Sequence, residues 1–198
     1  MKQLLRPALV LLLLMTALTG LCYPLLLTGA ARVFFPEKAA GSLVRQGSRV
    51  AGSSLIGQSF SNPAYFFGRP SATSPQAYNA AASGASNLGP SNPALRAAVK
   101  ERVAALRAAD PGQAAPIPVD LVTSSASGLD PHISLAAARY QAPRVARLRD
   151  LPVEQVQALI AAHARLRWLG VFGEPRVTVL ELNLALDRRA PLSAAPRR

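Results

Sequence analysis

The sequence predicts an α+β fold, with a single N-terminal transmembrane helix followed by one mixed α/β soluble domain. Three observations predict it. Residues 7–31 contain no charged residue and are mostly aliphatic, and about 20 such residues span a bilayer as a helix. Residues 32–187 mix turn-rich stretches with apolar patterns of both strand and helix spacing, as an α+β domain requires. A length of 198 residues leaves little room for a second domain.

Two other interpretations of the apolar segment must be weighed against a retained anchor. A cleaved signal peptide would end after Ala30 or Ala31, but signal sequences have apolar cores of only about 7 to 15 residues. Lipidation at Cys22 requires a small residue before it, and the chain has Leu21 there. We therefore expect a retained transmembrane helix, preceded by a short N-terminal tail over residues 1–6.

Basic residues flank both ends of the apolar segment, so their count does not fix its orientation. Lys2 and Arg6 precede it, and Arg32 and Lys38 are among those that follow. A very short tail ahead of an apolar segment favours export of a long C-terminal domain. We therefore expect residues 32–187 to be exported.

The stretch after the anchor is rich in Gly, Ser, Asn and Pro, which favours turns and short strands. Residues 54–60 and 64–69 predict two of these strands because apolar and polar residues alternate in them. Asn92 is the expected N-cap of a helix that has Pro93 in its first turn and ends at residues 110–112.

The second half predicts further helices and strands. Residues 117–123 predict a strand from their apolar pattern. Ser134 is the expected N-cap of a helix that Pro143 breaks, because proline lacks an N–H. Pro152 opens another helix, which we expect to end near Leu169.

The C-terminal part predicts a last strand and a tail. Residues 176–186 are rich in β-forming residues, and Leu180, Leu182 and Leu184 would share one face of a strand. Residues 188–198 are predicted to be a basic, disordered tail.

The composition limits the classes of partner and of chemistry. The formal net charge of +12 suits a protein that approaches nucleic acid or anionic lipid. The arginines lack interleaved aromatic residues and no nucleic-acid motif is present, so we expect no nucleic-acid partner. A single cysteine, Cys22, excludes an intramolecular disulfide and a cysteine-based metal cluster.

Catalytic motifs are sparse. His132 and His163 lie far apart in the sequence without partners at ligand spacing, so we expect no metal site and structural or surface roles for both. Residues 83–86 lack the strand-turn-helix pattern of a serine nucleophile. A phosphate-binding loop of the Gly-x-x-x-x-Gly-Lys-Ser/Thr type is also absent. The sequence therefore predicts a protein that is not an enzyme.

Several long blocks of residues carry a resemblance to a known family. They occupy residues 57–60, 65–72, 83–93, 119–123, 127–133, 141–146 and 182–186. In this order they resemble the C subunit of the Kdp-type potassium-transporting ATPase. The similarity runs from the anchor to about Asp187, and the number of long motifs makes it specific.

The resemblance implies an accessory subunit of an ATP-driven pump for high-affinity potassium import, needed for assembly and activity. The implied partners are a channel-like potassium-translocating subunit, a P-type ATPase subunit and a small membrane subunit, together with the lipid bilayer. The implied location is the bacterial inner membrane, with the domain on the periplasmic or extracellular side. No tightly bound cofactor is implied, and ATP would enter through the ATPase subunit.

The family is also described as a catalytic chaperone that raises the ATP affinity of the ATP-hydrolysing subunit. The glutamine proposed there as a nucleotide contact matches Gln141. ATP is cytoplasmic, however, so direct nucleotide binding conflicts with an exported domain. The alternative interpretation of Gln141 is a helix-end residue that forms a local hydrogen bond before Pro143.

Loop residues in the matching blocks are candidates for contacts with partner subunits. They are Arg69, Ser83, Gly84, Ser86, Asn87 and Asp130. The alternative interpretation of Arg69, Asn87 and Asp130 is that of turn residues bonded to nearby backbone. Without the resemblance, the alternative function is a membrane-anchored, exported module that binds a ligand through its Gly, Asn and Ser loops.

Two positions depart from the family pattern. Phe67 stands where a histidine is expected before Gly-Arg-Pro-Ser-Ala, which argues against a proton-linked role at that position. Ala85 stands where glycine is usual in Ser-Gly-Gly-Ser. A Cβ there restricts φ and hinders the close approach of a phosphate to the loop.

Overall fold

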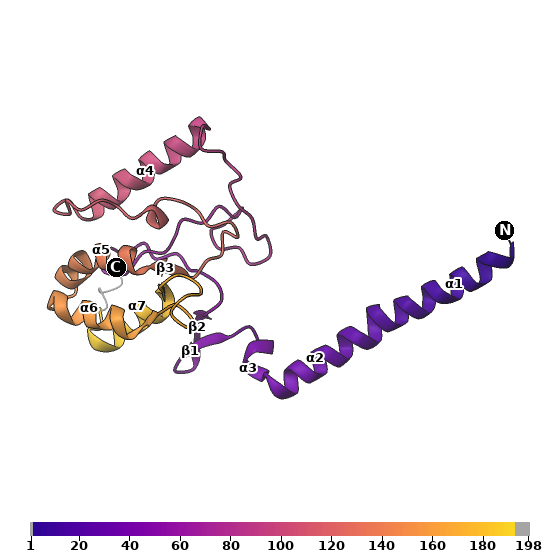
Figure 1. Cartoon of the computed structure of the whole chain (residues 1–198). Helices are drawn as coiled ribbons and strands as arrows, with labels where there is room; N and C mark the ends of the chain where they lie inside the picture. Colours follow the sequence, from indigo (N-terminus) through magenta and orange to yellow (C-terminus); the bar gives the residue numbers. More distant parts are fainter. Residues whose placement is uncertain (1, 193–198) are drawn as a thin grey trace, which may run out of the picture. The chain divides into compact units, whose positions relative to one another are not determined.

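The N-terminal part of the chain is one long helix (Figure 1). The computed structural model describes residues 2–192. Helix α1 (Lys2–Ala17) continues through the π-helical turn η1 (Leu18–Cys22) into α2 (Tyr23–Phe34). The stretch Leu4–Phe34 is 31 residues long, is not buried in the fold, and is apolar enough to cross a membrane. At about 1.5 Å per residue it exceeds the roughly 30 Å of a hydrocarbon core, which allows tilt.

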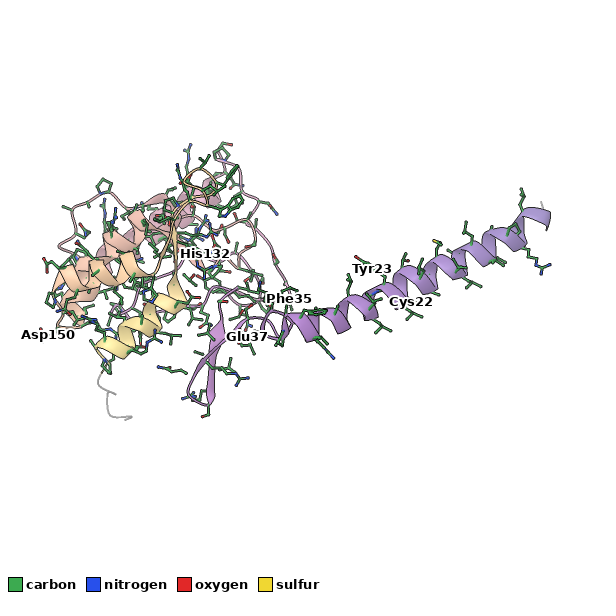
Figure 2. The ribbon with its side chains drawn as sticks, turned by 60° about the horizontal axis from the view of Figure 1, so that its bottom comes forward. Cys22, Tyr23, Phe35, Glu37, His132 and Asp150 are labelled. Carbon is green, nitrogen blue, oxygen red and sulfur yellow. The ribbon has the colours of Figure 1, made fainter. Side chains whose placement is uncertain are left out.

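The widened turn η1 has a cause in the sequence. Pro24 lies at the start of α2 and lacks an N–H, and its ring would clash with the carbonyl four residues back in a regular helix. The N–H of Tyr23 instead donates to the carbonyl of Leu18, five residues back. Cys22 and Tyr23 lie at this point of the helix (Figure 2). The helix therefore continues past the proline without a break.

The chain divides into two compact units, one up to Ala51 and one from Gly52 onward. After α2 the first unit has a short helix, α3 (Pro36–Ala39). Strands β1 (Leu43–Gln46) and β2 (Arg49–Ser53) form a two-stranded hairpin. Its turn includes Gly47 at φ 62°, a conformation that glycine adopts without strain.

The second unit contains a small antiparallel sheet with the strand order β3-β5-β4. Its strands are β3 (His132–Ser134), β4 (Ala164–Arg165) and β5 (Arg176–Thr178). In the β3–β5 register Ile133 lies opposite Val177, and both are buried. The chain thus follows the predicted α+β class, with the long apolar helix ahead of a mixed domain.

Helices α5 (Leu135–Leu148) and α7 (Val179–Arg189) pack against this sheet, and α6 (Val153–Ala162) packs against these two helices (Figure 1). The core includes the fully buried side chains of Phe66, Val145, Ile160, Leu182 and Leu186. Phe66 comes from an irregular segment, so the core joins this segment to all three helices.

Two helix starts confirm the predicted caps. In α4 (Pro93–Ala109) the Asn92 side chain accepts a hydrogen bond from the N–H of Ala94. In α5 the Ser134 hydroxyl accepts from the N–H of Ala137. These bonds satisfy N–H groups that the first turn of a helix leaves unpaired.

The predicted break at Pro143 is wrong. Helix α5 runs through this proline without interruption. Its face buries Ala138, Ala142 and Val145 almost completely. Packing of this face outweighs the lost backbone hydrogen bond, as tertiary contacts often outweigh local preference.

Three of the predicted strands are also wrong. Residues 54–60 and 64–69 are turns and irregular chain, and residues 117–123 contain only the 3₁₀ turn η2 (Val119–Leu121). Pro116 and Pro118 provide no donor for a strand ladder. The Thr123 hydroxyl donates to the carbonyl of Val119, so this turn is held by local bonds.

The end of α6 and the last predicted strand also differ from expectation. Helix α6 ends at Ala162, and β4 follows at once. Residues 176–178 are the strand β5, after which the chain becomes helix α7, which includes Arg188 and Arg189. Within the part assigned to the tail, residues 193–198 lie outside the described residues.

Candidate functional site

An irregular segment at Phe66 and Phe67 is held by two side-chain amides. The Phe66 N–H donates to Asn183 Oδ1 at 2.9 Å, and Asn183 Nδ2 donates to the Phe66 carbonyl at 3.0 Å. The Phe67 N–H donates to Gln141 Oε1 at 2.8 Å, and Gln141 Nε2 donates to the Phe67 carbonyl at 3.2 Å. The side-chain amides of Asn183 in α7 and Gln141 in α5 therefore bond to the N–H and carbonyl groups of this segment, as neighbouring strands do in a sheet. We call Phe66, Phe67, Gln141 and Asn183 the amide clamp.

Gln141 is a buried residue with its amide fully engaged. Its side chain is 1% exposed, and Oε1 also accepts a bond of 2.8 Å from Arg144 Nη2. It lies inside α5, not at a helix end, and its partners are 74 residues away at Phe67 as well as in its own helix. Gln141 thus has one local bond, to Arg144, together with long-range bonds to Phe67, while the nucleotide contact stays a prediction.

Two buried arginines extend the hold on this segment. Arg144 donates to the carbonyls of Pro63 and Tyr65, and its guanidinium lies 4.2 Å from the centre of the Phe67 ring. Burial lowers the pKa of Arg144 to about 10, although the Asp110 charge acts to raise it. Carbonyl oxygens and an aromatic face thus surround this cation.

Arg149 holds the other side of the same segment. It donates to the Ala64 carbonyl at 2.9 Å and pairs with Asp187 at 2.8 Å. Its guanidinium lies 4.5 Å from the centre of the Tyr65 ring, and the Tyr65 hydroxyl donates to Asp187 at 3.0 Å. Burial, followed by the hydrogen bond to Asp187, raises the pKa of Tyr65.

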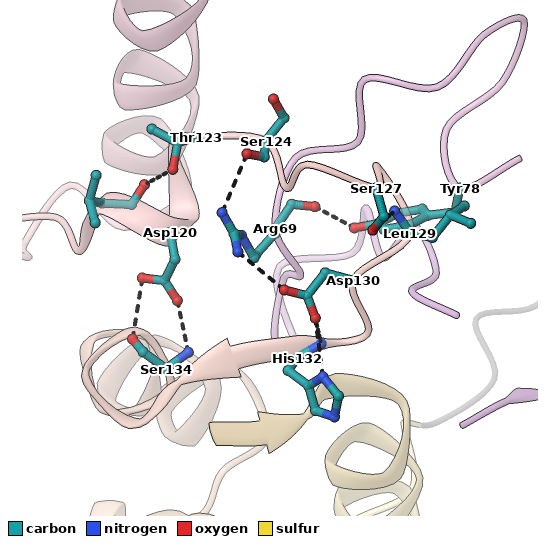
Figure 3. Close-up of polar contacts among 11 residues, drawn as sticks. Arg69, Tyr78, Asp120, Thr123, Ser124, Ser127, Leu129, Asp130, His132 and Ser134 are labelled. Carbon is teal, nitrogen blue, oxygen red and sulfur yellow. Dashed lines mark hydrogen bonds and ion pairs between the residues drawn. The ribbon is translucent and has the colours of Figure 1, made fainter. Parts of the chain in front are cut away.

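Arg69 and Asp130, both expected in partner-contact loops, are brought together (Figure 3). Arg69 Nη1 lies 3.1 Å from Asp130 Oδ2, and Nη2 donates to the Ser124 carbonyl at 3.3 Å. The His132 N–H donates to Asp130 Oδ1 at 3.0 Å, and His132 Nδ1 lies 3.1 Å from the same oxygen. Arg69 therefore bonds to residues that are distant in the sequence. Asp130 bonds to Arg69 and also to the nearby backbone N–H of His132, as the alternative interpretation of a turn residue expects.

The pKa of Asp130 is the net result of opposed effects. Burial acts to raise it, but the hydrogen bonds and charge of His132 and the hydrogen bond from Arg69 outweigh burial and lower it. The carboxylate is thus held ionised between two cationic or donor groups.

Tyr78 closes this cluster from a third loop. Its hydroxyl donates to the Arg69 carbonyl. A Cβ added at Gly57 would approach the Tyr78 ring within 3 Å, and one added at Gly68 would approach the Tyr78 hydroxyl oxygen within 3 Å. Burial, followed by the Asp130 charge, raises the pKa of Tyr78 to about 12. Glycine at positions 57 and 68 is therefore required by close approach.

The remaining loop candidates divide into two groups. The Ser83 hydroxyl donates to the Ser127 carbonyl at 3.0 Å, and the Gly84 N–H donates to the same oxygen at 2.9 Å. Ser86 and Asn87 are exposed, and Asn87 has φ 51°. Ser83 and Gly84 thus fix the loop that carries Asp130, while Ser86 and Asn87 face solvent.

Two cavities share Arg69, Asp130 and His132 in their walls. One has a volume of about 380 Å³ and also includes Glu174 and Arg176. The other, of about 610 Å³, is lined mainly by residues 125–131. Charges of both signs line the first cavity, which suits recognition of a polar group more than nucleophilic chemistry.

Within residues 2–192, no three His, Cys, Asp or Glu side chains come together to hold a metal ion. His132 is bonded to Asp130, and His163 Nδ1 lies 2.9 Å from the Leu159 carbonyl at the end of α6.

The sequence reading missed Asn183, Arg144, Arg149 and Tyr78. The sequence does contain a signal for Asn183. Val179, Leu182 and Leu186 are spaced as on one face of a helix, and Asn183 follows Leu182 next to that face. A polar residue on the buried stripe of a helix must find a hydrogen-bond partner.

The raised pKa of Tyr78 predicts a pH dependence of stability. The pKa of Tyr78 is about 12 in the folded state and 10.0 in the unfolded state. The stabilisation that Tyr78 gives to the fold is therefore complete below pH 10 and is lost as the pH rises toward 12. We expect Tyr78→Phe to remove this dependence. Thermal melting of the full chain in detergent at several pH values measures it, and parallel curves for the two proteins from pH 10 to 12 would contradict the assignment.

Comparison with known proteins places this chain in a family. Residues 5–188 match the family model described as "KdpC: K+-transporting ATPase, c chain". That range covers both the long apolar helix and the mixed domain.

Close relatives cover nearly the whole chain. A potassium-transporting ATPase KdpC subunit from Variovorax paradoxus is 67% identical over 96% of this chain and 98% of its own length. The protein of the same description from Polaromonas naphthalenivorans is 63% identical over 98% and 99%. The one from Methylibium petroleiphilum is 65% identical over 96% and 100%. The chain therefore belongs to the KdpC family and is a non-catalytic subunit of the Kdp potassium-transporting ATPase.

Proposed function

We propose that this chain is the accessory subunit that the Kdp pump needs for assembly and for high-affinity potassium import. Its partners would be the channel-like potassium-translocating subunit, the P-type ATPase subunit and a small membrane subunit. The amide clamp is the observation that carries the proposal. It shapes loops for contact with a partner, and the side-chain amides of Gln141 and Asn183 are already hydrogen-bonded within the chain.

The proposal places the chain in the bacterial inner membrane as a single-pass protein. The 31-residue apolar helix near the N-terminus supports a membrane anchor. We place the domain on the periplasmic or extracellular side, since long C-terminal domains translocate largely regardless of flanking charge. Contacts by the loops that carry Arg69, Ser83 and Asp130 would then be made on that side.

Any effect on the ATP affinity of the ATPase subunit would, in this proposal, pass through subunit contacts. Gln141 is 1% exposed, and each of its two amide heteroatoms already has a hydrogen-bond partner in the chain. A nucleotide contact would require breaking bonds to Phe67 or Arg144 and exposing buried groups, at about 1 to 3 kcal/mol for each group left without a partner. We infer that the role of Gln141 is structural: it fixes the segment at Phe67 and does not set the ATP affinity.

Removal of the subunit tests the accessory role. We expect cells that lack this chain to lose potassium uptake at low external potassium while the ATPase subunit keeps its own catalytic residues. Re-expression of the full chain should restore uptake, and copurification with the other Kdp subunits separates this function from an independent ligand-binding module. Normal uptake by a complex without the chain would refute the proposal.

A substitution of Gln141 tests how ATP affinity is affected. We expect Gln141→Ala to lower the stability of the domain, because the Phe67 backbone and Arg144 lose buried partners. The half-saturating ATP concentration of the intact complex should stay within about twofold of the wild type, since a lost direct contact worth about 1.4 kcal/mol would change it tenfold. Gln157→Ala, at an exposed glutamine of α6, is the matched control.

A second variant keeps this test decisive if Gln141→Ala does not fold. Gln141→Glu keeps an oxygen to accept bonds from Phe67 and Arg144, but replaces the Nε2 donor with a carboxylate, whose charge would repel an anionic nucleotide in direct contact. Unchanged ATP dependence of this variant supports the structural role. A tenfold rise in half-saturating ATP, with the complex intact by gel filtration, would show direct nucleotide contact in either variant.

A further inference from the structure

A short hairpin between β4 and β5 exposes a cluster of large apolar side chains. From Gly52 onward, eight large apolar residues are exposed in the part of the chain that the structure describes, and five of them lie within residues 166–172. They are Leu166, Trp168, Leu169, Val171 and Phe172, each between 61% and 73% exposed. We call residues 166–172 the apolar tip. Such a concentration marks an interaction surface, because single exposed apolar residues are scattered on ordinary surfaces.

The apolar tip is ordered by its own backbone. The N–H groups of Trp168, Gly170, Val171 and Phe172 all donate to carbonyls of Arg167, Trp168 or Phe172 within the hairpin. The rings of Trp168 and Phe172 lie 5.8 Å apart between centroids. The tip is thus shaped before it meets a partner, which reduces the ordering cost of binding.

The base of the hairpin belongs to the core sheet. Ala164 lies opposite Val177 and Arg165 opposite Arg176, and Val177 is completely buried. The apolar tip is therefore carried on a rigid element of the second unit.

Positive charge surrounds the apolar tip. Arg165, Arg167 and Arg176 lie at or next to it and are exposed. Two glutamates offset part of this charge: Glu174 pairs with Arg167 at 3.0 Å, and Glu181 pairs with Arg165 at 3.5 Å. A tryptophan and apolar residues beside arginines are the composition of surfaces that enter the interface of a bilayer with anionic lipid. The charge therefore complements phospholipid headgroups.

We propose that the apolar tip inserts into the interfacial layer of a bilayer that contains anionic phospholipid, as a second membrane contact besides the N-terminal helix. Insertion requires backbone polar groups to be satisfied without water, and four N–H groups of the tip already are. A stable protein interface needs about 800 Å² from each partner. Seven residues at the end of a hairpin are small for that purpose but sufficient for a tethered contact.

The chain itself keeps the second unit near a membrane. The membrane-spanning candidate helix ends at Phe34 and the second unit begins at Gly52. At about 3.5 Å per extended residue this connection spans at most about 60 Å, so the effective concentration of the bilayer at the tip is high. A weak insertion energy therefore gives high occupancy.

Trp168 is the only tryptophan in the chain, so its fluorescence reports on the tip alone. The full chain is reconstituted in vesicles of phosphatidylcholine and phosphatidylglycerol, with and without bromine on the acyl chains. We expect bromolipid to quench most of the Trp168 emission, and acrylamide in the water to quench little. The double variant Leu169→Asp, Val171→Asp should reverse both results, whereas Val119→Asp, at a residue 68% exposed outside the tip, should change neither.

Three results would overturn the proposal. The first is Trp168 emission that acrylamide quenches and bromolipid does not. The second is bromolipid quenching that survives in the double variant with its circular dichroism unchanged. The third is shielding of Trp168 that arises only when the other Kdp subunits are present, which would assign the tip to a protein partner.

Discussion

The fold depends on how the backbone of an irregular segment is satisfied inside the core. Phe66 is completely buried, yet neither it nor Phe67 lies in a strand. Buried N–H and C=O groups without partners are costly. The amides of Asn183 and Gln141 supply those partners from two helices. These four hydrogen bonds therefore tie both helices to the segment and fix the path of the chain at Phe66 and Phe67.

The sequence predicted the parts of the fold that rest on local chemistry. The caps at Asn92 and Ser134 and the long apolar helix follow from residue type and spacing. Prediction failed where tertiary contacts decide. Helix α5 continues through Pro143 because its buried face outweighs one lost bond, and residues 179–189 form a helix although their leucines also alternate with a period of two.

The candidate site was predictable only in part. Arg69 and Asp130 were singled out from the family motifs, but their contact joins residues 61 positions apart, which no local pattern shows. The buried arginines Arg144 and Arg149 escaped notice because they bond to backbone carbonyls of a distant segment, and Tyr78 because its partner is a carbonyl in an irregular loop. Placement of such groups depends on the three-dimensional path of the chain. In a subunit without catalytic function, the surface that this path of the chain forms is what partner subunits would contact.

Amide hydrogen exchange of the full chain in lipid nanodiscs tests the central role of the amide clamp most directly. The account predicts that the N–H groups of Phe66 and Phe67 exchange as slowly as that of core residue Val177, because they open only with the fold. The exposed loop residue Ser86 should exchange rapidly in the same sample. Exchange of Phe66 and Phe67 at the rate of Ser86 would show that the segment is held by something other than these side-chain amides.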